Sequence, residues 1–79
     1  MENRETPVKQ IPIKTKSIQL DQFLKWADLV NSGGQAKSLI QEGKVLVNGE
    51  VEYSRGKKLY PGDRISFAGE AQEFQVSGD

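Results

Sequence analysis

The feature that most constrains this chain is a change in the spacing of its apolar residues at Gly43. Before Gly43 they recur every three or four residues, as on one face of a helix, and after it every second residue, as on one face of a strand. Helices followed by strands are typical of an α+β domain, in which the two form separate layers. Its 79 residues suffice for one domain, since ordinary domains contain about 100–200 residues.

Two helices are predicted ahead of Gly43, over residues 20–30 and 33–42. Each has one apolar face, formed by Leu20, Phe23, Leu24 and Ala27 in the first and by Ala36, Leu39 and Ile40 in the second. Ser32 followed three residues later by Gln35 matches a capping box at the start of the second helix, and Gly43 is placed to end it in the left-handed conformation. The short break between the helices predicts a helical hairpin.

The rest of the chain predicts a small antiparallel sheet under this hairpin. Residues 8–14 are expected to form an extra N-terminal edge strand, because Pro12 cannot donate to a ladder. Four short strands follow the helices, and Asn48-Gly49 is a strong hairpin signal between the first two. A two-residue loop is one option. We prefer a three-residue loop over residues 48–50, because it pairs Val47 with Val51 and Val45 with Tyr53 and so gathers four apolar side chains on one face.

The absence of Cys and His removes most catalytic and metal chemistry. Thiolate chemistry, the usual zinc ligands and histidine-activated nucleophiles are excluded, and no pair of carboxylates stands out for acid–base work. The sequence therefore predicts no enzyme, no cofactor, no metal and no small-molecule substrate. It also contains no run of about 18 apolar residues that could span a membrane and no apolar secretory segment near its start. We expect a cytoplasmic monomer.

The formal net charge is zero, but the charges are unevenly distributed. Residues 25–64 contain seven basic and five acidic side chains, whereas residues 65–79 contain three acidic side chains and no basic one. Such asymmetry favours a surface that faces a polyanion. An ordinary solvated exterior is the alternative interpretation, and the charge pattern alone favours it.

Two segments are candidates for binding RNA. In the first, Gly33 and Gly34 open the second helix, where free N–H groups attract anions, and Lys37, Gln41 and Lys44 project from the side opposite its apolar face. In the second, Arg55, Lys57 and Lys58 place three cations within four residues. Each has a simpler interpretation, a capped turn or a solvated surface. Trp26, Tyr53 and Tyr60 could stack on bases, but packing is favoured for them, with Tyr53 facing inward.

Several spaced motifs resemble one known family. They are Leu20-Asp21-x-x-Leu24, Ala36-x-x-Leu39-Ile40-x-x-Gly43, Val45-x-Val47-Asn48-Gly49 and Gly62-Asp63-x-Ile65. Together they resemble the RNA-binding domain first described in small-subunit ribosomal protein S-four, also known as the αL-type RNA-binding fold. Further motifs are similar to the stand-alone bacterial group called YaaA or YbcJ, namely Ser32-Gly33-Gly34-x-Ala36-Lys37 and Arg55-Gly56-Lys57-Lys58-Leu59.

The resemblance implies a non-catalytic RNA-binding module that acts on ribosomal RNA or on an assembling ribosomal subunit. The broader family often has Ser-Arg at the start of the second helix, where this chain has Gly33-Gly34, so Lys37 and Lys44 are expected to supply the charge. We expect a disordered segment over residues 1–7, a single domain over 8–76 and a tail over 77–79. The alternative function is a protein-interaction module that docks on a ribosomal subunit protein.

Overall fold

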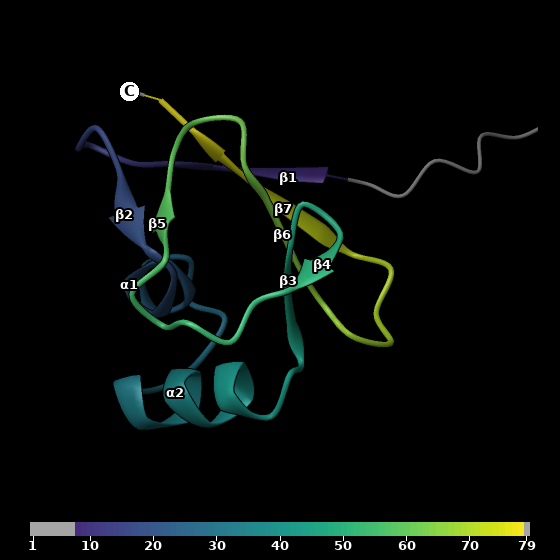
Figure 1. Cartoon of the computed structure of the whole chain (residues 1–79). Coiled ribbons are helices and arrows are strands. Elements are labelled where there is room, and N and C mark those ends of the chain that lie inside the picture. The colour runs from purple at the N-terminus through teal and green to yellow at the C-terminus, as the bar shows by residue number, and fades with distance from the viewer. Residues whose placement is uncertain (1–7, 79) are drawn as a thin grey trace, which may run out of the picture.

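The described part of the chain, residues 8–78 of a computed structural model, contains two helices and two sheets. The larger sheet has five strands in the order β1-β7-β6-β3-β4, and β2 pairs with β5 in a separate ladder (Figure 1). The strands are β1 Val8–Pro12, β2 Ile18–Gln19, β3 Val45–Val47, β4 Glu50–Val51, β5 Lys58–Leu59, β6 Arg64–Phe67 and β7 Glu73–Ser77. The expected disordered segment 1–7 lies outside the described residues, and β7 includes Ser77, the first residue of the expected tail.

The predicted α+β class is confirmed, with α1 Leu20–Trp26 and α2 Gly33–Gln41 packed against each other below the five-stranded sheet (Figure 1). Both apolar faces point into one core, which consists of Ile11, Ile13, Leu20, Phe23, Leu24, Val30, Ala36, Ile40, Val45, Val47, Leu59, Ile65, Phe74 and Val76. No polar or charged side chain within residues 8–78 is buried. The interior is therefore held by apolar packing.

α1 ends at Trp26, four residues earlier than predicted. Asp28 adopts the left-handed conformation with φ 61°. The N–H of Leu29 then donates to the carbonyl of Leu24 at 2.9 Å, and the N–H of Asp28 to that of Lys25 at 3.0 Å. This is a Schellman ending, which glycine usually provides. The helix therefore stops before the glycines that the sequence offers.

α2 follows its prediction closely. Ser32 Oγ accepts a hydrogen bond from the N–H of Gln35 at 3.1 Å, and Gln35 Oε1 accepts one from the N–H of Asn31 at 2.7 Å. Gly43 has φ 75° and ends the helix as expected. A Cβ at this position would lie 3.1 Å from the hydroxyl of Tyr53, so the glycine also makes room for a neighbouring ring.

The predicted three-residue hairpin loop is wrong. The register pairs Leu46 with Val51 and Val47 with Glu50, which leaves a two-residue loop of Asn48 and Gly49. Both loop residues have positive φ, 53° and 88°, the type I′ geometry that matches the twist of the flanking strands.

The outward position of Tyr53 follows from this register. The side chain of Tyr53 is 64% exposed, so the prediction that it faces inward is also wrong. Turn geometry has prevailed over the gathering of four apolar residues on one face.

The N-terminal strand occupies an edge of the sheet as predicted, but its pairing makes the sheet mixed rather than purely antiparallel. β1 runs parallel to β7, from Val8 opposite Glu73 to Pro12 opposite Ser77. Nearly the whole domain separates the two strands along the chain, so no short hairpin imposes antiparallel pairing on them.

Neither helix described between residues 8 and 78 is long and apolar enough to cross a membrane.

Candidate nucleic-acid interface

The start of α2 presents unpaired backbone donors at the surface. Gly33 and Gly34 are exposed, and their N–H groups meet no protein acceptor within residues 8–78. Lys37 and Gln41 lie four residues apart on the exposed side of the same helix. Four of the predicted residues therefore lie on the exposed side of α2. The positive end of the helix dipole, at Gly33, and the ammonium of Lys37 both favour an anion there.

Lys25 was not among the predicted residues, but it lies beside the start of α2, and we call Gly33, Gly34, Lys37 and Lys25 together the α2 corner. A Cβ built on Gly33 would lie 3.9 Å from Cδ of Lys25, so the last turn of α1 places a lysine stem beside the start of α2. The signal in the sequence was weak, because Lys25 is one polar residue on the solvent side of a predicted helix. Only the crossing of the two helices shows its neighbour.

Lys44 lies apart from the stripe of Lys37 and Gln41 to which we assigned it. The backbone leaves the helix at Gly43, and the N–H of Lys44 donates to the carbonyl of Leu39 at 3.1 Å. The ammonium of Lys44 is 3.3 Å from Glu42, and both side chains are more than half exposed. Exposed pairs of this kind contribute at most about 1 kcal/mol, so Lys44 can exchange its carboxylate for a phosphate.

The segment that carries Arg55, Lys57 and Lys58 is fixed at both ends. The ring of Tyr53 approaches Gly43 at the end of α2. The carbonyls of Arg55 and Lys57 accept hydrogen bonds from the N–H groups of Asp21 and Leu20 at 3.1 and 2.8 Å. The segment therefore runs from the end of α2 to the start of α1 (Figure 1), and it satisfies backbone donors that open the first helix.

Lys57 and Lys58 face a hollow with acidic walls. The hollow has a volume of about 350 Å³, and its lining includes Glu50, Glu52 and Asp63. These carboxylates reduce the positive potential at the two lysines. The eight predicted residues are all exposed. The structure divides them between the α2 corner, the end of α2 with Gln41 and Lys44, and this mixed-charge segment, so they do not form one uniform basic face.

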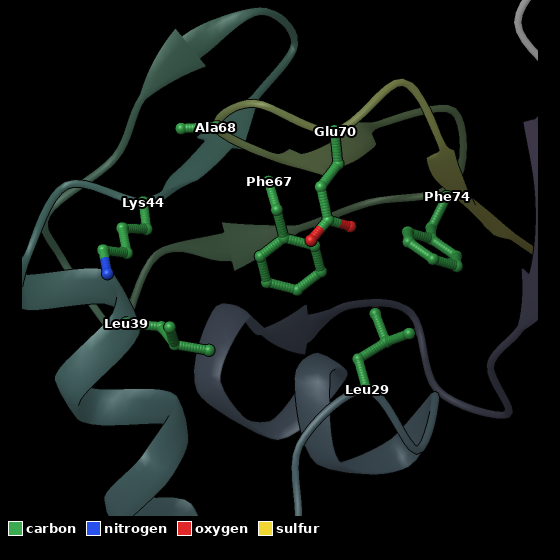
Figure 2. A pocket seen from close by; sticks show the side chains of 7 residues that line it. All are labelled: Leu29, Leu39, Lys44, Phe67, Ala68, Glu70 and Phe74. Atoms are coloured by element: carbon green, nitrogen blue, oxygen red, sulfur yellow. The ribbon is translucent and has the colours of Figure 1, made fainter.

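A pocket of about 550 Å³ lies on another part of the surface, between the two helices and the connection from β6 to β7 (Figure 2). Leu29, Leu39 and Phe67 point into it, and Phe67 meets Phe74 edge to face with ring centroids 6.4 Å apart. Lys44 and Glu70 also line it. The pocket therefore combines apolar side chains with one charge of each sign, which suits a protein side chain better than a polyanion.

Within residues 8–78 no group of three or more His, Cys, Asp or Glu side chains could hold a metal ion. The α2 corner combines N–H donors with two lysines, a set that fits phosphate oxygens.

Known proteins are similar in sequence to this chain. The family model described as the S4 domain matches residues 11–77. The Bacillus subtilis (strain 168) protein named "Probable ribosome maturation protein RlbA" is 51% identical over 66 residues, which cover 84% of this chain and 92% of that protein. YbcJ of Escherichia coli (strain K12), whose name describes a candidate RNA-binding protein, is 41% identical over 56 residues, which cover 71% of this chain and 80% of that protein.

Proposed function

Because the chain belongs to the S4 domain family, we propose that it is a non-catalytic module that binds structured ribosomal RNA during maturation of a ribosomal subunit. The observation that carries the proposal is the α2 corner, where the free N–H groups of Gly33 and Gly34 lie beside Lys25 and Lys37 follows on the same helix. RNA phosphates are the natural ligand of such donors, and the shape of the RNA supplies selectivity.

The names of the relatives support the choice of RNA. One relative is named for ribosome maturation and another for RNA binding. We extend the interface from the α2 corner to Gln41, Lys44, Arg55, Lys57 and Lys58, with the last two contributing less because of the acidic hollow. The module acts as a cytoplasmic monomer over residues 8–76 and needs no cofactor, metal or small-molecule substrate.

Filter binding of ribosomal RNA fragments across a salt series tests this function. A Lys37/Lys44/Lys57/Lys58→Ala variant is expected to bind more weakly and with a shallower dependence on salt, because each lost phosphate contact removes about one unit from the slope of log K against log salt. Lys9→Ala/Lys16→Ala, which also removes surface lysines, serves as the control and should bind like the unmodified chain. Equal, salt-insensitive binding by all three proteins would refute the proposal.

Crosslinking in cells followed by sequencing of the bound RNA identifies the partner. Ribosomal RNA should dominate the recovered sequences, with crosslinks concentrated in one structured region. Recovery of messenger or transfer RNA in proportion to abundance would contradict a role on the ribosomal subunit.

A second function is favoured by the pocket of Figure 2, which lies between the helices and the connection from β6 to β7. Its lining of Leu29, Leu39 and Phe67 fits an apolar side chain of a ribosomal subunit protein, and the zero net charge is unusual for a nucleic-acid domain. A pull-down of ribosomal proteins that survives nuclease treatment would support this function against RNA binding, whereas loss of the proteins on nuclease treatment would support RNA binding.

A further inference from the structure

Trp26 is an exposed aromatic ring whose position is fixed. Its side chain is 52% exposed, yet its indole Nε1–H donates to the carbonyl of Pro12 at 2.7 Å. The acceptor belongs to edge strand β1, so the hydrogen bond ties the end of α1 to the sheet. A ring that is held in place and left open to solvent is suited to stacking, because little conformational entropy is lost when a planar ligand covers it.

Two shallow hollows adjoin Trp26, with volumes of about 390 and 320 Å³. Ile18, Gln22 and Trp26 line both of them, Lys25 lines the first and Lys14 the second. No Asp or Glu within residues 8–78 lines either hollow, whereas the pockets near Lys44 and near Lys57 both include carboxylates. The surroundings of Trp26 therefore combine a ring, an apolar floor and cations without opposing charge.

Lys25 connects this surface to the α2 corner, because it lines the first hollow and its stem passes close to Gly33. Gln22 lies four residues before Trp26 and so on the same side of α1. No hydrogen bond within residues 8–78 engages its side-chain amide, which offers both donors and an acceptor.

We propose that Trp26 and Gln22 form a base-binding platform on which an unpaired nucleotide stacks while its flanking phosphates contact Lys25 and the start of α2. The inference rests on the proposed RNA-binding function and adds an unpaired base to the structured RNA that the function requires. The ring covers one face of the base, the amide of Gln22 reaches its edge, and Lys14 and Lys25 neutralise the neighbouring phosphates.

Trp26 is the only tryptophan in the chain, so its fluorescence reports on this position alone. The full chain is titrated with a hairpin from the ribosomal RNA that it binds, carrying an unpaired adenosine tail, and with the same hairpin made blunt. The tailed RNA is expected to quench the fluorescence and the blunt one to leave it nearly unchanged. Equal quenching by both RNAs, or quenching only by an acidic peptide that contains tyrosine, would overturn the platform.

Filter binding of the same RNAs to variants gives the second readout. Trp26→Leu should weaken binding of the tailed RNA about tenfold and change binding of the blunt RNA by less than about twofold. Trp26→Phe keeps an aromatic ring but loses the hydrogen bond that holds it to Pro12, so its affinity for the tailed RNA should lie between those of the unmodified chain and Trp26→Leu. Tyr60→Leu is the matched control, because Tyr60 is also 52% exposed but lines the hollow with acidic walls.

The outcomes separate the platform from the proposed function. If the unmodified chain binds neither RNA, both fail. If it binds the blunt RNA and Trp26→Leu weakens both RNAs equally, or neither, the RNA-binding function stands and the platform fails. Circular dichroism of each variant shows whether an equal loss reflects unfolding, and in that case the quenching titration of the unmodified chain still decides.

Discussion

Two requirements meet at Gly43. Its φ of 75° ends α2, and the space on its Cα is taken by the ring of Tyr53, whose hydroxyl would lie 3.1 Å from a Cβ. Tyr53 in turn begins the segment that leads to Arg55. Because Gly43 has a hydrogen atom where other residues have a Cβ, the chain can leave the helix there and the segment that carries Arg55 can pass close by.

Replacing Gly43 by alanine should destabilise the domain. A left-handed conformation costs a residue with a Cβ about 1–2 kcal/mol, and the contact with Tyr53 adds strain. Gly43→Ala is therefore expected to lower the free energy of unfolding in urea by at least about 1 kcal/mol. Gly56→Ala is the control, since nothing lies within 4 Å of its added Cβ. Equal stability of the two variants would contradict this account.

Single residues also mark where the sequence could and could not predict the fold. The ends of α2 were predictable because Ser32, Gln35 and Gly43 are the residues that usually serve there. The end of α1 was missed because Asp28, not a glycine, adopts the left-handed conformation. Asp does so often enough to be tolerated but too rarely to be read as a stop signal.

Among the elements, the β3–β4 hairpin depends on its turn more than on its apolar pattern. Asn48 Oδ1 accepts a hydrogen bond from the N–H of Arg64 at 3.0 Å, and its Nδ2 donates to Asp63 at 3.2 Å. Its own N–H donates to the carbonyl of Arg64 at 2.7 Å. The turn is therefore attached to the start of β6, and this attachment fixes the register.

Asn48→Ala should loosen the hairpin. It removes the side-chain hydrogen bonds to Asp63 and Arg64, and alanine tolerates a positive φ less well than asparagine, so a loss of about 1–2 kcal/mol in the free energy of unfolding is expected. Asn31→Ala is the control, because the side chain of Asn31 makes no hydrogen bond within residues 8–78 and only its backbone N–H donates one, to Oε1 of Gln35. Chemical denaturation measures both variants, and a loss at Asn31 as large as that at Asn48 would contradict the assignment.

The register of this hairpin could not be predicted by counting the apolar residues that each register would place on one face. The count favoured a register that buried Val51 and Tyr53, but these side chains are 44% and 64% exposed. Such a count of apolar residues uses no information on β6, which pairs with β3 and is hydrogen-bonded to Asn48 through Arg64. Contacts between segments distant in sequence decided the pairing.

Over the whole molecule, the zero net charge results from different charges on different surfaces. The α2 corner and the surroundings of Trp26 carry lysines, whereas the hollow beside Lys57 is lined by three carboxylates. The sequence indicated that the charges were unevenly spread, because this needs only a count along the chain. It could not show that Lys25 joins Gly33 or that Lys57 faces acids, because helix crossing and strand pairing create those neighbours.

The two kinds of lysine should differ in their dependence on salt. Lys37→Ala is expected to reduce the slope of log K against log salt for ribosomal RNA by about one unit, the value for one phosphate contact. Lys57→Ala should reduce it by less, because Glu50, Glu52 and Asp63 already offset its charge. Filter binding at several salt concentrations measures both slopes. A larger change for Lys57 than for Lys37 would place the main contact elsewhere.

The parallel pairing of β1 with β7 also affects when the domain can form. Of the described strands, β1 is synthesised first and β7 last, so β1 leaves the ribosome without its partner. The helical hairpin can form from local contacts during translation, but the edge of the sheet closes only after the final strand has emerged. Completion of the fold is thereby coupled to the synthesis of β7, and a nascent chain that stalls before β7 keeps β1 unpaired.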